Sequence, residues 1–291
     1  MRVLIVLLAL IFPLSLSAAE KLKVVTSFSI LADITRQIGG DTIVVQNLVA
    51  PGQDAHTYTP TTADTQRLLK ADLIVENGLG YEPWLDSFIA KNNKVKPTVV
   101  ASTGVIPVTT EQKGNTVTDP YAWLNLANVE LYIDNITTAL IAADPNNAKI
   151  YTSNSKNYVK QIHALLVQAR LRFGALSEAE RNIVTSYNEL AYMGHPYGIY
   201  FIAPAGISTG HELSSAELAA LIKQIKNDKI NAVFMDNIKD PHSLQQITDK
   251  TSARVGGPLY TTSLATQGPA ATFLGMYEYN LDTLYDALKK Q

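Results

Sequence analysis

The sequence contains no cysteine, carries little net charge and has no long apolar run after its first residues. Without cysteine the chain has no disulfide, no thiol nucleophile, no thiolate metal site and no lipid-modified N-terminal cysteine. A formal net charge of -2 provides neither the basic surface that nucleic acids require nor a polybasic patch for anionic lipids. We therefore expect a soluble protein, once its N-terminal segment is removed, that binds no nucleic acid.

The first 19 residues predict a secretory signal peptide. Arg2 provides a cationic start, residues 3–16 are almost entirely apolar, and small residues at 17–19 precede the charged Glu20. The apolar run is too short to span a bilayer comfortably, which favours a cleaved signal over a membrane anchor. We expect delivery of the mature protein to the periplasm.

Two motifs recur in the same order in both halves of the chain. The sequence VTSF at 25–28 is matched by VTSY at 184–187, and the apolar strand at 71–77 is matched by one at 231–237. Both of these later strands end in an acidic residue and an asparagine, and the spacing between the motifs is nearly equal in the two halves. The repeat predicts an α/β fold of two similar lobes, each with a mainly parallel sheet covered by helices, that flank a cleft.

Two helices are predicted between the lobes, at 128–143 and at 146 to about 175, and no Gly/Ser-rich hinge separates them. A long rigid helix that joins the lobes would allow only a modest ligand-driven motion. The predicted divisions of the chain are a signal peptide at 1–19, an N-terminal lobe at 20–127, linking helices at 128–177 and a C-terminal lobe at 178–291.

Loops beyond the carboxyl ends of the strands are where ligand-binding side chains are expected. The loop at 49–60 has prolines near both ends and His56 between small and polar residues. A neutral imidazole on a stiff loop suits a divalent metal ion. The alternative is a surface histidine that forms hydrogen bonds only within its own turn.

A series of sequence motifs, in a fixed order along nearly the whole chain after the predicted signal peptide, resembles that of a known protein family. They are Pro51-Gly52, DAHTYTP at 54–60, ADLIVENG at 71–78, DPYAW at 119–123, VTSY at 184–187, VGGPLY at 255–260 and the segment 268–280. These motifs resemble those of the metal-binding solute-binding proteins of zinc, manganese and iron ABC importers. The resemblance implies two lobes, a rigid linking helix and a metal site in the cleft, with a membrane permease and its ATPase as partners.

The family typically supplies four metal ligands, which the resemblance places at His56, Tyr121, Tyr187 and Thr262. Only His56 is a usual ligand. In the family the position of Tyr121 usually carries histidine, that of Tyr187 histidine or glutamate, and that of Thr262 aspartate. Neutral tyrosine is a poor ligand for Zn²⁺ or Mn²⁺, since binding requires the loss of a proton whose reference pKa is about 10. The substitutions therefore argue against an ordinary high-affinity zinc or manganese site.

Three interpretations of the tyrosines remain open. His56 with phenolates from Tyr121 and Tyr187 would form a hard, oxygen-rich set suited to Fe³⁺. The cleft could instead hold an organic or anionic solute, against which the tyrosines stack and donate hydrogen bonds. In the third interpretation the tyrosines only fill the space that the lost ligands left.

The predicted function is periplasmic capture of a solute for a metal-ion ABC importer, without enzymatic activity. A divergent protein that serves as a sensor or interaction module is the alternative. The segment 206–210 matches the G-x-S-x-G pattern around Ser208, but a nucleophile elbow needs a helix that begins at this serine. The better helix start is Ser214, with Glu217 completing a capping box, which disfavours a serine hydrolase.

Overall fold

The computed structural model describes residues 20–91, 96–112, 115–177, 181–185, 190–202, 214–227, 230, 232–236 and 242–289. The predicted signal peptide, Tyr187 and Ser208 lie outside these residues, so the predictions that concern them stay predictions. In the part of the chain that is described, no helix combines the length and the apolar character needed to cross a membrane.

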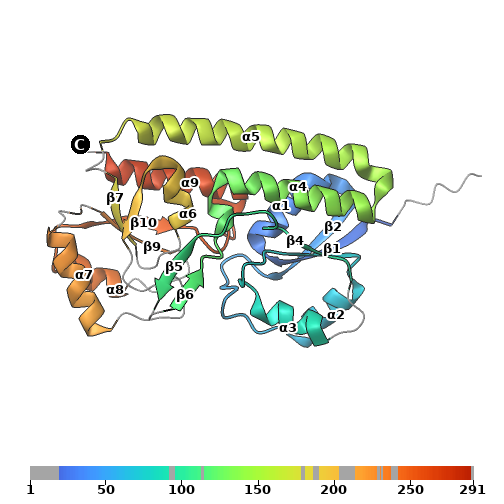
Figure 1. The fold of residues 1–291 in the computed structure, drawn as a ribbon, viewed down its shortest axis with the longest axis horizontal. Helices are drawn as coiled ribbons and strands as arrows, with labels where there is room; N and C mark the ends of the chain where they lie inside the picture. The colour runs from blue at the N-terminus through green and yellow to red at the C-terminus, as the bar shows by residue number, and fades with distance from the viewer. Residues whose placement is uncertain are drawn as a thin grey trace, which may run out of the picture.

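Two sheets of parallel strands confirm the predicted α/β fold with two similar lobes (Figure 1). The N-terminal sheet has the order β2-β1-β3-β4, with β1 (Leu22–Phe28), β2 (Ile43–Val49), β3 (Leu73–Glu76) and β4 (Thr98–Val100). The C-terminal sheet has the order β10-β9-β7-β8, with β7 (Asn182–Thr185), β8 (Tyr200–Ile202), β9 (Ala232–Asp236) and β10 (Arg254–Leu259). In each lobe the first strand lies between the second and the third, so the two sheets share one topology.

The sequence repeat corresponds to equivalent neighbouring strands. Thr26 lies opposite Val75 in the N-terminal sheet, and Thr185 lies opposite Phe234 in the C-terminal sheet. In the N-terminal sheet the acidic residue that ends the strand directly follows Val75. In the C-terminal sheet the corresponding acidic residue is the second one after Phe234. This offset explains why the spacing of the motifs differs by one residue between the halves.

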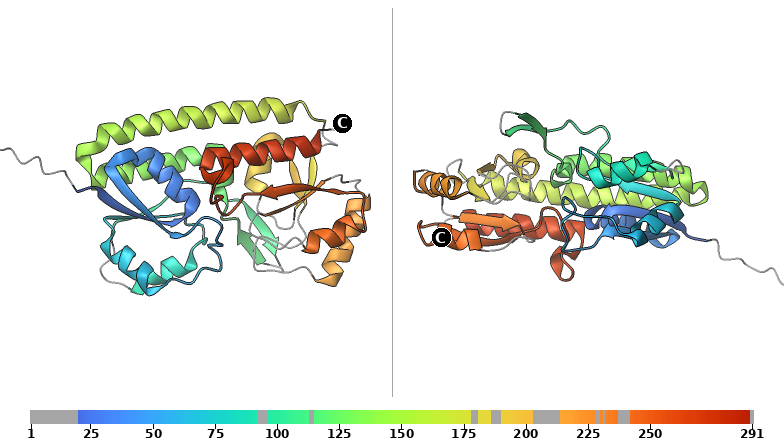
Figure 2. Two further views of the ribbon diagram at one scale, coloured as in Figure 1. Left: turned by 180° about the vertical axis from the view of Figure 1, so that it is seen from behind. Right: turned by 90° about the horizontal axis from the view of Figure 1, so that it is seen from below.

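Short helices and a hairpin complete the lobes. In the N-terminal half these are α1 (Ser29–Gly39), α2 (Thr62–Lys70), α3 (Pro83–Lys91) and the antiparallel hairpin β5 (Thr109–Gln112) and β6 (Asn115–Thr118). In the C-terminal half they are α6 (Ala191–Gly194), α7 (Ser215–Asn227) and α8 (His242–Thr248). The hairpin stands out from the body of the molecule in the right-hand view of Figure 2. The predicted capping box of α7 is present, because Ser214 and Glu217 exchange hydrogen bonds at its start.

Long helices flank the two sheets, one beside each sheet and one that spans both (Figures 1 and 2). They are α4 (Leu126–Ala143), α5 (Ala148–Gly174) and α9 (Phe273–Leu288). With 27 residues, α5 is about 40 Å long and extends along both sheets. Its buried face follows helical spacing and consists of Tyr151, Tyr158, Ile162, Leu165, Leu166, Ala169 and Phe173. This face anchors α5 along its whole length, as expected of a rigid connection.

One main hydrophobic core extends through both lobes. It includes Val24 and Ile34 from the N-terminal lobe, Tyr158 from α5, and Phe234 and Met276 from the C-terminal part. Smaller clusters lie on the outer faces of the two sheets, one under α2 and α3 and one under α7. The lobes are therefore joined by shared apolar packing as well as by a helix.

Candidate functional site

Three of the four candidate ligands, His56, Tyr121 and Thr262, lie on described loops where the two lobes meet. His56 follows β2 and Thr262 follows β10, at the carboxyl ends of parallel strands, where open α/β sheets bind ligands. Tyr121 lies between β6 and the short 3-10 helix Ala122–Leu124, which leads into α4. Tyr187 follows β7 but lies outside the described residues, so its part in the site stays a prediction.

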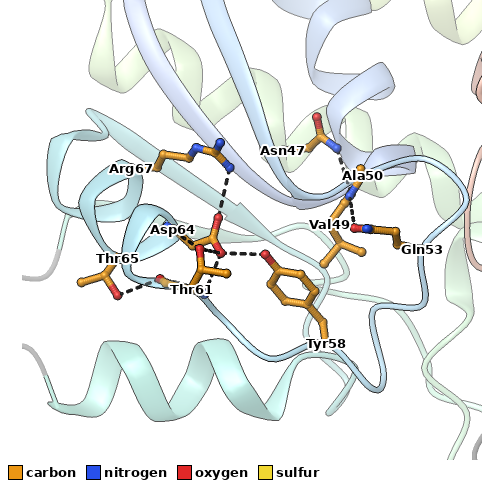
Figure 3. A network of polar contacts seen from close by, with 9 residues as sticks. All are labelled: Asn47, Val49, Ala50, Gln53, Tyr58, Thr61, Asp64, Thr65 and Arg67. Carbon is orange, nitrogen blue, oxygen red and sulfur yellow. Dashed lines mark hydrogen bonds and ion pairs between the residues drawn. The ribbon is translucent and has the colours of Figure 1, made fainter.

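The loop that carries His56, residues 50–61 (the His56 loop), begins with a tight turn. The Gln53 amide donates to the Ala50 carbonyl at 3.1 Å, and Gly52 has a φ of 79°. Pro51 followed by a residue with positive φ is the pattern of a type II turn, which explains the Pro-Gly pair. The Gln53 side chain closes the turn further, because its Oε1 accepts from the Ala50 amide at 3.2 Å (Figure 3).

Asp64 fixes the other end of the His56 loop (Figure 3). Its Oδ2 accepts hydrogen bonds from the Tyr58 hydroxyl at 2.7 Å and from the Thr61 amide at 2.8 Å, and its Oδ1 accepts from Arg67 at 3.0 Å. Asp64 and Thr61 together form the capping box of α2. Burial by itself raises the pKa of Asp64. The hydrogen bonds from Thr61 and Tyr58 lower it by more, so the pKa lies below the ordinary value.

The centre of the loop is held by two hydrogen bonds to the peptide group between Ala55 and His56. The Trp84 Nε1 donates to the Ala55 carbonyl at 2.9 Å, and the His56 amide donates to Asp54 Oδ1 at 2.9 Å. The histidine is therefore presented on a loop that is restrained at its two ends and in its middle.

We expect the Asp64→Ala variant to lose about 2 kcal/mol of stability at neutral pH, because the Thr61 and Tyr58 donors lose their acceptor. A carboxylate with a depressed pKa stabilises the fold above its unfolded pKa, and this contribution disappears as pH falls through the folded pKa. The difference in the free energy of unfolding between the variant and the wild type should therefore shrink below about pH 3.8. Urea unfolding at several pH values measures this change.

Glu217→Ala is a matched control for that experiment, since it removes the same type of capping box from the exposed start of α7. We expect it to cost less, about 1 kcal/mol. A loss for Asp64→Ala no greater than that of Glu217→Ala would contradict the role given to Asp64.

His56 and Tyr121 contact each other directly. The His56 Nε2 lies 2.7 Å from the Tyr121 Oη, and the tautomer of the ring decides which of the two donates. Tyr121 is fully buried, while His56 is partly exposed. The imidazole therefore bonds to a side chain 65 residues away, which differs from the alternative in which it contacts only its own turn.

An aromatic cluster surrounds this pair. The Tyr81 ring lies edge-on to the His56 ring with centroids 4.6 Å apart, and 4.8 Å from the Trp123 ring. Phe28 packs against both Tyr81 and Trp123 at 4.9 Å. Sequence reasoning missed Tyr81, which contacts the histidine more closely than Tyr121 does when ring centroids are compared.

Thr262 approaches this cluster from the C-terminal lobe. The Tyr81 hydroxyl donates to the Thr262 carbonyl at 3.5 Å, and the Trp123 Nε1 donates to the Thr261 carbonyl at 2.8 Å. Thr262 is fully buried, and within the described residues its Oγ1 has no hydrogen-bond partner. The structure thus brings His56 and Tyr121 together and connects Thr262 to them through Tyr81.

The main chain at Tyr121 is held by two buried polar residues. The Tyr121 amide donates to Asp119 Oδ1 at 2.8 Å, and the Asn77 side chain donates to the Pro120 carbonyl at 3.0 Å. Asn77 also accepts from the Tyr132 hydroxyl. Burial raises the pKa of Asp119 to about 7.

Glu82 supports the opposite side of Asn77. It is buried and accepts hydrogen bonds from the Ser27 hydroxyl at 2.6 Å, the Asn77 amide at 2.8 Å and the Gly78 amide at 3.2 Å. Burial raises the pKa of Glu82 to about 8, against the lowering effect of these donors. Across the residues that the structure describes, no three His, Asp or Glu side chains gather closely enough to hold a metal ion. The acids near the site therefore support loops rather than form a carboxylate metal centre.

Residues 24–287 match the model of the ZnuA family, described as the periplasmic component A of the zinc-uptake complex. The chain belongs to this family. The match covers both lobes and the linking helices, and it confirms the family resemblance seen in the sequence.

Two relatives and one solved structure illustrate this membership of the ZnuA family. The chain is 32% identical to the iron-binding protein YfeA of Yersinia pestis over 91% of this chain and 86% of YfeA. It is also 32% identical to the manganese ABC transporter substrate-binding lipoprotein PsaA of Streptococcus anginosus, over 94% of this chain and 91% of PsaA.

The solved structure is the Mn-bound periplasmic metal-binding protein of Candidatus Liberibacter asiaticus. It superposes with a TM-score of 0.83 at 31% identity and covers 92% of this chain and 100% of that chain. The relatives are named as an iron-binding protein, an ABC transporter substrate-binding lipoprotein and a periplasmic metal-binding protein, which confirms the prediction that the chain is a binding protein rather than an enzyme.

Proposed function

We propose that this chain is the extracytoplasmic binding component of a metal-ion ABC importer and that it carries its cargo between the two lobes. Family membership supports this function, and the relatives named for iron and manganese support a metal ion as cargo. The proposed partners are a membrane permease and its cytoplasmic ATPase. The proposed route is export to the periplasm with removal of residues 1–19.

The contact between His56 and Tyr121 carries the proposal for the site, because it places two potential donor atoms at the junction of the lobes. Two ligands of one tetrahedrally coordinated ion are about 3.3 Å apart when each lies about 2.0 Å from the metal. The observed 2.7 Å is a hydrogen-bond distance. A metal ion that uses both atoms would break this bond and separate the side chains slightly.

The donor types indicate which ion the site prefers. An imidazole with phenol oxygens from Tyr121 and, in the proposed set, Tyr187 is harder than the carboxylate and histidine set of the family. Thr262 would add a neutral hydroxyl at the position of the usual aspartate. A phenolate is stabilised by a highly charged cation, so this set favours Fe³⁺ over Zn²⁺ or Mn²⁺.

The test is the metal content of the untagged mature protein, followed by titration with Zn²⁺, Mn²⁺ and chelated Fe³⁺. We expect one bound ion per chain, lost in His56→Ala. With Fe³⁺ we expect a visible phenolate charge-transfer band, which Tyr121→Phe weakens together with a loss of affinity of about tenfold or more. Unchanged Fe³⁺ binding in both variants would contradict the proposed site.

A second candidate is a binding protein that has lost its metal and carries another solute or acts as a sensor. The donor chemistry favours it, because neutral tyrosine and threonine at positions 121 and 262 are poor ligands for Zn²⁺ or Mn²⁺. A complete lack of response to all three ions would support this candidate. In that case a screen of organic and anionic solutes by thermal shift would follow.

A further inference from the structure

The His56 loop is joined directly to the loop that carries Thr262. The Gly52 amide donates to the Ser263 Oγ at 2.7 Å and, in a longer contact, to the Leu264 carbonyl at 3.2 Å. The positive φ of Gly52 belongs to the turn that aims this amide across the lobe junction. The two candidate ligand loops therefore share a hydrogen bond between residues 211 positions apart.

Ser29 completes this contact from the start of α1. Its Oγ accepts from the Leu264 amide at 3.1 Å and lies 3.4 Å from the Ser263 Oγ. Ser29 is 3% exposed and Ser263 is 1% exposed, so water does not replace these partners easily. We name the group of Ser29, Gly52, Ser263 and Leu264 the serine latch.

Contacts on either side of the latch tie the same C-terminal segment to the N-terminal lobe. The Trp123 indole donates to the Thr261 carbonyl at 2.8 Å, before the latch. Beyond it, the Phe273 amide at the start of α9 donates to the buried Asp33 Oδ2 at 2.8 Å. The segment 261–273 thus follows a strand of the C-terminal lobe but is bonded to the N-terminal lobe at three points.

We propose that Ser263 is a positioning residue that makes the His56 loop and the Thr262 loop move as one body. Its hydroxyl accepts from one loop while its main chain belongs to the other, so a displacement of either loop breaks a buried hydrogen bond. The latch fixes the position of Thr262 relative to His56. Conformational change on cargo binding then falls on the strands and helices of the C-terminal lobe. This inference rests on the proposed function only for its effect on cargo affinity.

The decisive experiment is hydrogen–deuterium exchange of the full mature protein without added metal, read in peptides that cover 50–61 and 260–268. In Ser263→Ala we expect exchange to become about two- to tenfold faster in both segments together, as the loss of one buried hydrogen bond implies. Ser29→Ala should give the same pattern more weakly, because the bond from Gly52 to Ser263 remains. Faster exchange in 260–268 alone, or in neither segment, would overturn the proposal.

Thr137→Val is the matched control, because it removes another buried hydroxyl, which donates within α4 to the Ile133 carbonyl at 2.6 Å. We expect it to leave exchange in both loops unchanged. If it accelerated both loops as much as Ser263→Ala does, the effect would be general destabilisation and the latch would be refuted.

Titration of the same variants with Zn²⁺, Mn²⁺ and chelated Fe³⁺ measures the effect on cargo. We expect Ser263→Ala to weaken binding of the preferred ion by about two- to tenfold and Thr137→Val to leave it unchanged. If the wild type binds none of these ions, the proposed cargo is wrong, and the exchange measurement alone still decides whether the latch exists.

Discussion

Replacing Trp123 with alanine is expected to lower the free energy of unfolding by about 3–5 kcal/mol, the range for large aromatic residues removed from a packed core. Trp123 is fully buried, and its ring contacts those of Phe28, Tyr81 and Tyr121. The truncation also leaves the Thr261 carbonyl, in the other lobe, without its indole donor. Urea unfolding followed by circular dichroism measures the loss.

Trp84→Ala is the comparison for this experiment, since the chain has only two tryptophans and both donate to a main-chain carbonyl. Trp84 is only partly buried, and its ring contacts that of Tyr58 at the edge of the small cluster under α2 and α3. We expect a loss of about 2 kcal/mol for Trp84→Ala, because less apolar surface returns to water. Equal losses for the two variants would show that Trp123 has no special role at the lobe junction.

The second large effect is a fall in stability as pH rises from about 5 to 8. Burial raises the pKa of Glu82 to about 8 and that of Glu76 to about 7, where the second shift is increased by nearby Asp86. The unfolded chain ionises these groups near pH 4.5, so the folded state binds more protons throughout this window. Each group then lowers the free energy of unfolding by up to about 1.4 kcal/mol per pH unit until its folded pKa is reached.

Glu82→Gln should remove the contribution of one proton from this slope. The variant retains an amide oxygen for the Ser27 and Asn77 donors, although its amide nitrogen faces the Gly78 amide. We therefore expect lower stability at pH 5 but a flatter curve between pH 5 and 8. The carboxylate of Asp64, whose pKa is depressed, titrates below this window and does not obscure it. Identical slopes for the variant and the wild type would contradict the raised pKa of Glu82.

The fold was predictable because its determinants are periodic or repeated in the sequence. The VTSF and VTSY motifs mark equivalent first strands, and the apolar face of α5 follows helical spacing along its full length. The Pro51-Gly52 pair and the pair of Ser214 and Glu217 are local patterns with local consequences, a turn and a capping box. Such features need no knowledge of distant parts of the chain.

The arrangement of the site was only partly predictable. His56 was identified from its loop, but nothing near Tyr81 in the sequence indicates that its ring lies against the imidazole. The bond between His56 and Tyr121 and the latch at Ser263 join residues that are distant in sequence and meet only through the packing of the lobes. Serine and glycine also occur in many loops, so their pairing has no sequence signature that a single chain reveals.

The shared core affects how the chain reaches its native state. Side chains of α9, such as Phe273, Met276 and Leu281, belong to the same core as Val24 and Ile34 near the other end of the described chain. As a polypeptide is synthesised or threaded through a membrane channel from its N-terminus, the first lobe therefore emerges without the partners that cover it. The shared core can be completed only when nearly the whole chain is available. Neither lobe is therefore expected to fold when expressed alone.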